Sequence, residues 1–435
     1  KAMLGREVSL KWNKPDGLTF SGYNIYRSAS AFDAPDQATR LNESLLIDEM
    51  YRDLPPSDGL YFYRVSRVGM NGVEGDLSFA TQVIADGTPP KATITITPRG
   101  LYDPIANVFG PGSLDVELRV SELLNIDAPF LSLTPHQGSP ITIILNQMSD
   151  PLVYRGSAYI KTITPSGTAW FLYSGRDRIG NRGTEIISGG SVVIDTDGPR
   201  MVNLAIQPAS PIQNNAEQPE SMFVTFELDG VVKDGTTPQL FYQLDHLTNG
   251  PVAITDVSPL SARTWLGAFT LPADAGEVPE NLLISHRSTD PVGNVGTDIQ
   301  PRNEFEVYQN QLPALESPYG LNAQSQPRGK IQLTWRAMDG AADYQLYRKD
   351  PGSTSFTALV RSAGMTNYLD TPAIEGIYSY KVATIRQVNG QESVGQPGNE
   401  VSAISDATPP GVPKELKLEL RPQGIYVDWV APAFT

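Results

Sequence analysis

The sequence predicts an all-β fold, an elongated tandem array of β-sandwiches. Short runs alternate apolar with polar residues, as at 8–12 and 61–65, and this period of two marks strands with one buried face. Glycine (38 residues) and proline (36 residues) are frequent, as expected for many turns between short strands. The 435 residues are too many for one core and indicate roughly three to five domains.

A short seam occurs three times and marks candidate joints between domains. It reads Ile-Ala-Asp-Gly-Thr-Pro-Pro at 84–90, Ile-Asp-Thr-Asp-Gly-Pro at 194–199 and Ile-Ser-Asp-Ala-Thr-Pro-Pro at 404–410. Proline lacks an N–H and fixes φ, so a sheet ladder ends there. It also holds the preceding residue extended. We therefore expect the chain to leave each domain stretched rather than coiled.

A further joint is predicted between the second and third seams, because that interval is about twice the first. Asn-Gly hairpin signals at 71–72 and 389–390 and a Gly-Asn signal at 180–181 precede the three seams at similar spacings. Applying the same spacing after Gly293-Asn294 places the hidden joint at 309–318. The predicted domains are therefore 1–85, 86–194, 195–308, 309–405 and 406–435.

The first and fourth predicted domains repeat each other. The matching runs, in the same order, are 8–12 with 331–335, 22–27 with 343–348, and 59–65 with 376–382. These residues resemble fibronectin type III domains, over about ninety residues each time. The resemblance implies a core tryptophan on strand B at Trp12 and Trp335. It also implies a tyrosine that makes a corner hydrogen bond at the start of strand F, at Tyr61 and Tyr378.

The second and third predicted domains also repeat each other. Residues 177–184 match 290–297, and residues 154–159 resemble 265–269. These runs are similar to the Ig-like domains of large, repetitive bacterial surface proteins. Residues 208–219 are expected to form a long polar loop.

Both ends of the sequence are predicted to hold incomplete domains. Leu321 precedes Trp335 by 14 positions, whereas only 11 residues precede Trp12, so most of a first strand is expected upstream. The tail contains two predicted strands, and a lone hairpin is marginal in water. We therefore expect residues 407–435 to fold only with a partner or with downstream residues.

Composition excludes several classes of partner and site. A net charge of −15 repels phosphate backbones and anionic membrane surfaces, so neither nucleic acid nor membrane docking is expected. Cysteine is absent, which excludes disulfides and thiolate sites. No apolar run approaches the length of a membrane span, so no membrane insertion is expected.

No catalytic or cofactor-binding residue is predicted, and we expect a chain that is not an enzyme. His136, His246 and His286 lie far apart in the sequence without metal-ligand spacing, so we expect surface or half-buried side chains. The residue types of a Ser-His-Asp triad are present, but no nucleophile-elbow motif occurs. The glycine pairs are isolated turn signals rather than phosphate loops.

Aspartates at the joints raise a calcium hypothesis. Asp195 and Asp197 lie in a seam, and Asp177 and Asp290 stand beside Gly-Asn turns that could reach a joint. Ca²⁺ takes six to eight oxygen ligands, which carboxylates and carbonyls supply. The alternative, which we favour, is that each aspartate caps its own turn by accepting nearby backbone N–H groups.

The predicted function is that of a non-catalytic structural, adhesive or spacer region of a large bacterial surface or secreted protein. The expected location is extracellular or cell-surface, with the periplasm as an alternative. The expected partners are protein or carbohydrate outside the cell, or copies of the chain itself. Two alternatives remain: accessory domains of a secreted enzyme such as a polysaccharide hydrolase, and a component of an extracellular or phage-like fibre. The step from fold to role is analogy.

Overall fold

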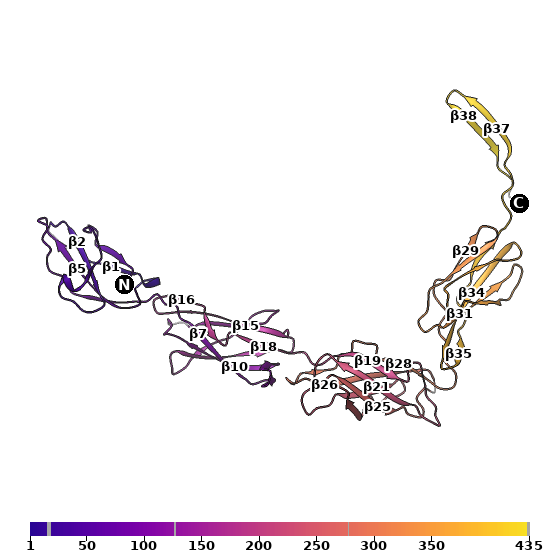
Figure 1. The fold of residues 1–435 in the computed structure, drawn as a ribbon, viewed down its shortest axis with the longest axis horizontal. Helices are drawn as coiled ribbons and strands as arrows, with labels where there is room; N and C mark the ends of the chain where they lie inside the picture. Colours follow the sequence, from indigo (N-terminus) through magenta and orange to yellow (C-terminus); the bar gives the residue numbers. More distant parts are fainter. Residues whose placement is uncertain (15–18, 126–127, 277, 433–435) are drawn as a thin grey trace.

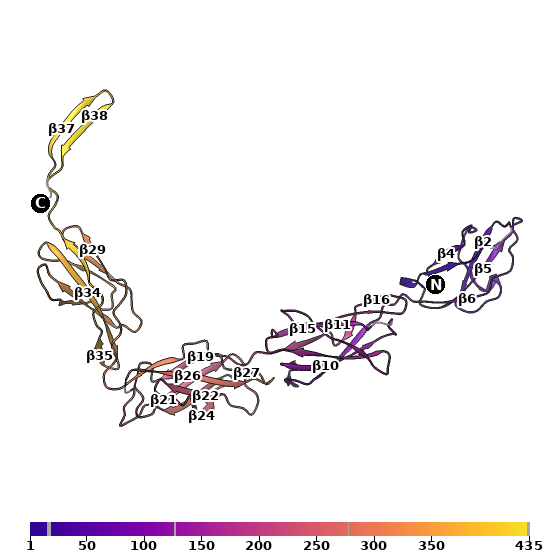
Figure 2. The same cartoon turned by 180° about the vertical axis from the view of Figure 1, so that it is seen from behind.

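The structure is a computed structural model that describes residues 1–14, 19–125, 128–276 and 278–432. Four β-sandwiches and a hairpin follow one another along a line that curves toward the C-terminal end (Figures 1 and 2). Each sandwich encloses its own cluster of buried apolar side chains. Within the described ranges, helix is limited to two 3₁₀ turns, η1 (Leu4–Arg6) and η2 (Pro35–Gln37). The predicted all-β fold is confirmed.

The first sandwich packs a two-stranded sheet, β1-β4, on a four-stranded sheet of order β3-β2-β5-β6. Alternation along β1 buries Val8 and Leu10, which meet Tyr61 and Tyr63 of β5 in the core. The strands are β1 (Val8–Lys11), β2 (Gly22–Ser28), β3 (Thr39–Arg40), β4 (Met50–Asp53), β5 (Gly59–Val68) and β6 (Thr81–Ala85).

The second sandwich has one sheet of order β13-β14-β10-β7-β17 and one of order β12-β11-β15-β18-β9-β8, with β16 paired to β15. Most pairs are antiparallel, but β17 runs parallel to β7 and β18 runs parallel to β9. The strands are β7 (Ala92–Pro98), β8 (Tyr102–Asp103), β9 (Val108–Phe109), β10 (Gly112–Val120), β11 (Phe130–Thr134), β12 (Ile141–Thr142), β13 (Asn146–Gln147), β14 (Val153–Ile160), β15 (Gly167–Arg176), β16 (Arg182–Gly183), β17 (Ile186–Ser188) and β18 (Ser191–Ile194).

The third sandwich packs a sheet of order β19-β21-β25-β24 on one of order β20-β28-β26-β22-β23, with β27 paired to β26. Here β20 runs parallel to β28. The strands are β19 (Met201–Gln207), β20 (Ile212–Gln213), β21 (Ser221–Leu228), β22 (Gln239–Leu244), β23 (Val252–Ile254), β24 (Asp256–Pro259), β25 (Thr264–Thr270), β26 (Glu280–Thr289), β27 (Val295–Gly296) and β28 (Glu304–Tyr308).

One sequence expectation fails in the third sandwich. Residues 208–219 are not simply a polar loop, because they contain β20. Ile212 is fully buried in the core, and Asn214 is buried with its amide donating to the carbonyls of Pro272 and Ala275. The sequence did not predict this strand, because Ile212 is one large apolar residue among polar neighbours and gives no periodic pattern.

The fourth sandwich packs a sheet of order β29-β30-β33 on one of order β32-β31-β34-β35, with β36 also paired to β34. The strands are β29 (Asn322–Gln326), β30 (Lys330–Thr334), β31 (Asp343–Lys349), β32 (Thr357–Arg361), β33 (Asn367–Asp370), β34 (Gly376–Val388), β35 (Gln391–Val394) and β36 (Val401–Ser405). Beyond it, β37 (Lys414–Arg421) and β38 (Gly424–Val430) form a separate hairpin with every residue of both strands exposed.

The tyrosine corner predicted from the fibronectin type III resemblance is confirmed in both sandwiches. The Tyr61 hydroxyl donates to the carbonyl of Ser57, and the Tyr378 hydroxyl donates to the carbonyl of Ile374, each at 3.0 Å. The predicted core tryptophan is buried at Trp335. Its counterpart Trp12 is only half-buried against its core cluster.

A buried polar cluster also repeats in these two sandwiches. In the first, Asp53 accepts hydrogen bonds from the Tyr63 hydroxyl at 2.7 Å and from the Arg27 guanidinium at 2.9 Å. In the fourth, Asp370 takes the same bonds from Tyr380 at 2.7 Å and Arg348 at 3.2 Å. The carboxylate is satisfied from both sides, which is what burial of a charge requires.

Candidate functional site

The three seams share one turn. In each, the first aspartate carboxylate accepts the backbone N–H two residues later: Asp86 from Thr88, Asp195 from Asp197 and Asp406 from Thr408, at 2.9–3.1 Å. Such local bonds hold the backbone in a turn without a partner strand. The favoured reading of these aspartates as turn caps agrees with this geometry.

A side chain from elsewhere in the same sandwich also holds each seam. It belongs to the residue directly before a long core strand, and that strand begins with glycine. Asp58, before β5, accepts the Gly87 N–H and the Thr88 hydroxyl. Glu375, before β34, accepts the Ala407 N–H and the Thr408 hydroxyl. These bonds lower the pKa of Asp58 and of Glu375, with the threonine hydroxyl as the largest cause in each case.

The second seam uses a serine at the same place. Ser166, before β15, accepts the Thr196 N–H at 3.0 Å and donates to Asp197 at 2.6 Å. A hydroxyl can both donate and accept, so Ser166 can serve the second carboxylate that this seam carries. The calcium candidates Asp195 and Asp197 therefore both lie beside Ser166.

The other two calcium candidates, Asp177 and Asp290, close a pair of matching turns. The Asp177 carboxylate accepts the N–H groups of residues 179, 180 and 181 and the side-chain amide of Asn181. Asp290 takes the corresponding bonds from Gly293, from the Asn294 N–H and from the Asn294 amide. Both carboxylates are buried, so each is satisfied by its own turn.

The asparagines of these turns reach the preceding joint. The Asn181 amide donates to the carbonyl of Asp86 at 2.9 Å, and the Asn181 side-chain oxygen accepts the Gly5 N–H at 2.9 Å. Asn181 thus bonds the first sandwich, the seam and its own sandwich. At the next joint, Asn294 donates to the carbonyl of Asp195 at 3.0 Å. Each of these turns is closed by its own aspartate, and its asparagine also fastens the joint.

The joint between the third and fourth sandwiches uses an ion pair instead. The Arg386 guanidinium on β34 donates to the Glu306 carboxylate on β28 at 2.6 Å and to the carbonyl of Pro313 at 3.1 Å. Arg386 is 7% exposed, so water screens this pair less than a surface pair. Gln391 adds a bond from its amide to the Gln213 side chain at 3.2 Å.

One acidic cluster lies at the first joint. Asp86, Glu122 and Asp177 each place a carboxylate oxygen within 4.8 Å of the others, the one such trio in the described part of the chain. Burial, followed by the negative charges of Asp86, Asp177 and Asp58, raises the pKa of Glu122 to about 7. Like charges this close disfavour ionisation unless a proton or a cation intervenes.

The second joint has two of these three carboxylates. Ser121 and Asp229 are equivalent, because each accepts the backbone N–H just after its seam, from Lys91 and Arg200. The next residue is Glu122 in one sandwich and Gly230 in the other. Burial and the neighbouring Asp290 charge raise the pKa of Asp195. Three carboxylate oxygens are fewer than the six to eight oxygen ligands that Ca²⁺ takes. Calcium binding therefore stays a hypothesis, with turn capping as the favoured interpretation.

The histidines require one correction. His286 is neither at the surface nor half-buried but 2% exposed, with its ring bonded to the Ser288 hydroxyl and the carbonyl of Asp298, each at 3.0 Å. Burial lowers its pKa. It lies on the buried face of β26, where its neighbours Ile284 and Leu282 also point. His246 pairs with Glu280 at 2.7 Å, and His136 lies near Trp170.

Sequence reasoning missed Glu122 and the joint-fastening role of Asn181 and Asn294. The asparagine signal was present, since both end an Asp-x-x-Gly-Asn run that recurs in two domains. Glu122 had no such signal, because its counterpart is glycine and its neighbours come from distant parts of the chain.

No helix in the described part of the chain combines the length and the apolar character needed to cross a bilayer. No family model matches the chain, and no curated protein matches it significantly.

Solved structures similar to the chain include three multidomain proteins. The FN1–FN3 domains of chicken CNTN1 are 11% identical, covering 73% of this chain and 98% of that one, with a TM-score of 0.27. A tetra-tandem repeat in the extending region of a large adhesion protein is 12% identical, covering 89% and 92%, with a TM-score of 0.27. A Ca²⁺-stabilized adhesin that helps an Antarctic bacterium bind ice is 11% identical, covering 92% and 92%, with a TM-score of 0.31. The fold class of this chain is that of tandem β-sandwiches, on the strands and cores described above.

Proposed function

We propose that this chain is a non-catalytic spacer in a large bacterial protein, located outside the cytoplasm at the cell surface or in secreted form. Its task is to hold other parts of that protein, or an adhesive face, at a distance. The five segments proposed as domains are 1–85, 86–194, 195–308, 309–405 and 406–435. The separate cores support the first four segments, and the fifth contains the hairpin of β37 and β38.

The observation that carries the proposal is the way the joints are fastened. Asn181 and Asn294 bond the seam carbonyls, and Arg386 pairs with Glu306 across the third joint. A flexible linker would make no such bonds and would let neighbouring domains swing freely. Joints held by these hydrogen bonds and this ion pair keep the molecule extended, which is the property that a spacer needs.

Small-angle X-ray scattering of the chain tests this proposal. We expect a pair-distance distribution with a long tail and a cross-section of one sandwich. A distribution matching a compact particle, or one describing freely jointed beads, would rule the spacer role out.

Two alternatives use the same architecture. The segments would be accessory domains if the parent protein carries a catalytic domain, such as one that hydrolyses polysaccharide. They would belong to a fibre if the chain assembles through exposed strand edges, which mass photometry across a range of concentrations would reveal. Partners at the cell exterior, protein or carbohydrate, fit all three roles.

A further inference from the structure

One outer sheet face of the second sandwich, the Trp170 face, is uncharged and partly apolar. On β11, on β18 and on β15 as far as Ser174, the residues that alternate with core positions are aromatic, aliphatic or hydroxyl side chains. Its large apolar side chains are 44–54% exposed and are Phe130, Trp170, Leu172 and Val193. The opposite outer face of the same sandwich carries ion pairs instead, Arg99 with Asp115 and Arg155 with Glu117.

The third sandwich shows that the fold does not require such a face. Its turn at 290–294 matches the turn at 177–181, so β26 corresponds to β15, and the strand ladders fix the other equivalent positions. The places of the four apolar side chains are taken there, in the same order, by Gln239, Leu283, Ser285 and Glu306. An exposed apolar patch that the fold does not need indicates an interaction site.

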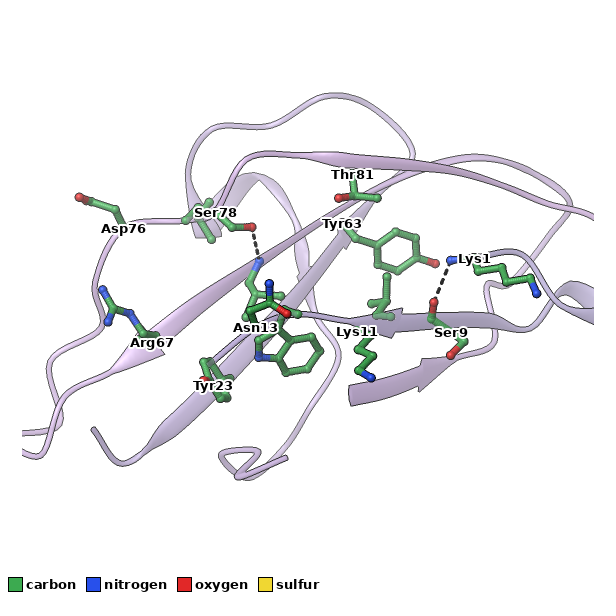
Figure 3. A pocket seen from close by; sticks show the side chains of 14 residues that line it. Lys1, Ser9, Lys11, Asn13, Tyr23, Tyr63, Arg67, Asp76, Ser78 and Thr81 are labelled. Atoms are coloured by element: carbon green, nitrogen blue, oxygen red, sulfur yellow. Dashed lines mark hydrogen bonds between the residues drawn. The ribbon is translucent and has the colours of Figure 1, made fainter. Parts of the chain in front are cut away.

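Trp170 also differs from the other tryptophans of the sandwiches. Trp265 and Trp335 are buried in their cores. Trp12 is half-buried. It lines a pocket of about 380 Å³ (Figure 3), together with the charged side chains of Lys1, Lys11, Arg67 and Asp76. Of these four tryptophans, Trp170 is the one that presents its ring on an uncharged sheet face.

Hydroxyl and imidazole groups surround the Trp170 ring. Thr134 on β11 and Ser191 on β18 are its cross-strand neighbours, one on each side. The exposed His136 ring has its centroid 6.3 Å from that of Trp170. A Cβ at Gly167 would lie 3.2 Å from the Cβ of His136, so the glycine leaves room for the imidazole beside the indole.

The hydroxyl of Thr134 is not used by the fold. It is shielded from water and has no hydrogen-bond partner among the described residues. A shielded hydroxyl without a partner is costly, so a ligand hydroxyl beside the Trp170 ring would relieve that cost.

These groups suit a neutral sugar ring. One face of many pyranose rings is formed by C–H groups, which an exposed indole can cover, while the sugar hydroxyls lie around the rim. Serine and threonine hydroxyls both donate and accept hydrogen bonds, and a neutral imidazole does so through its two nitrogens, as sugar hydroxyls require. The face has no charge with which to pair a charged ligand. A second copy of the chain would bring a further net charge of −15, which is repulsive.

We propose that the Trp170 face is a binding site for a neutral polysaccharide. One sugar ring stacks on Trp170, and its hydroxyls bond to Thr134, Ser191 and His136. This inference deepens the proposed function, on which it rests for a place outside the cell, by assigning an adhesive face and the chemical class of its ligand.

Affinity electrophoresis of the full chain tests the proposal. The net charge of −15 drives the chain through native gels that contain dextran, galactomannan, xyloglucan or mixed-linkage β-glucan, with acidic alginate as the comparison. We expect at least one neutral polysaccharide to retard the chain and alginate not to do so. Migration that none of the neutral polysaccharides changes would overturn the proposal, and so would retardation by alginate alone.

Variants of the face show whether the retardation comes from this site. Trp170→Ala should weaken binding at least about tenfold, because a central aromatic side chain carries much of the binding energy. Trp170→Phe keeps a ring and should retain part of the affinity. Thr134→Val keeps the shape but removes the hydroxyl, and should weaken binding about fivefold.

Phe223→Ala is the matched control. Phe223 is 48% exposed on the outer face of β21 in the third sandwich, so its removal should leave binding at the parent level. Equal melting midpoints of W170A and F223A would show that both variants fold. Equal dissociation constants of these two variants would overturn the proposal.

Two further measurements separate this inference from its neighbours. Sedimentation velocity should give a monomer for the parent and for W170A, and a dimer that W170A abolishes would overturn the proposal in favour of a second copy. Small-angle scattering of W170A should match the parent, because the variant changes no joint. Absence of sugar binding by an extended chain refutes only this inference, whereas a compact chain that binds sugar refutes only the spacer role.

Discussion

The side-chain amide of Asn181 donates a hydrogen bond to the main-chain carbonyl of Asp86, 95 positions earlier in the chain, at 2.9 Å. The same asparagine accepts the Gly5 N–H. Its counterpart Asn294 makes the same bond to Asp195. The first two joints are thus fastened by the same kind of asparagine hydrogen bond. A variant at one joint can therefore serve as the control for a variant at the other.

Replacing Asn181 with alanine should loosen the first joint. The change removes the bonds to Asp86 and Gly5, each worth about 1 kcal/mol. Distances between spin labels on the first and second sandwiches, attached to introduced cysteines, should spread over a wider range. Labels on the second and third sandwiches should be unaffected, and Asn294→Ala should give the reverse pattern. Equal spreads in both variants would mean that these asparagines do not hold the joints.

Glu122 should make the first joint sensitive to pH. Its pKa in the folded chain is raised to about 7, so the folded state holds this proton more tightly than the unfolded state does. The stabilisation is complete below the ordinary glutamate range, near 4.5, and is lost as the pH rises through about 7. Solvent screening reduces the effect to on the order of 1 kcal/mol.

The measurement is thermal unfolding of Glu122→Gln and the parent at pH 5 and pH 8. Glutamine imitates the protonated side chain, so the variant should melt higher than the parent at pH 8 and at the same temperature at pH 5. The exposed Glu43→Gln change serves as control. If the melting temperatures of the variant and the parent differ as much at pH 5 as at pH 8, the raised pKa of Glu122 is contradicted.

Calcium, if it binds at the joints, should relieve the same repulsion. Free Ca²⁺ at about 100 times its Kd would stabilise the folded chain by about 2.7 kcal/mol. Melting with calcium and with EDTA decides the question. The response of the first joint should vanish in E122Q, and that of the second in Asp197→Asn. An unchanged midpoint in EDTA and in calcium would remove the hypothesis for Asp177, Asp195, Asp197 and Asp290 together.

Removing the carboxylate of Asp53 should destabilise the first sandwich strongly. Asp53→Ala leaves Arg27 and the Tyr63 hydroxyl without their partner, at a cost of about 3 kcal/mol. Tyr63→Phe removes one neutral donor and should cost about 1 kcal/mol. Hydrogen exchange of β5 peptides reads out the first sandwich alone, and Asp370→Ala should act in the same way on β34. Equal losses in D53A and Y63F would show that the ion pair adds nothing.

Local rules predicted much of this molecule. Alternation predicted the strands, and matched runs predicted the corner bonds of Tyr61 and Tyr378. Aspartate beside a turn predicted the capping bonds of Asp177 and Asp290. Each of these features depends on residues that are close in sequence or that recur in order.

The missed features depend on distant segments. Glu122 meets Asp86 and Asp177 only because the end of β10, a seam and a turn converge in space. His286 is buried because its position on β26 faces the core, although its side chain is polar. Trp335 is buried whereas Trp12 is half-buried, although the two tryptophans stand in matching runs.

The parallel pairs β9–β18 and β20–β28 bear on how the molecule responds to tension. In each, a strand near the start of a sandwich lies beside the last one, so pulling on the two ends would slide the pair lengthwise. The ladder bonds then share the load and must rupture together instead of unzipping singly. We expect single-molecule stretching to unfold the second and third sandwiches at higher force than the first, which would make them the mechanically strong links of the array.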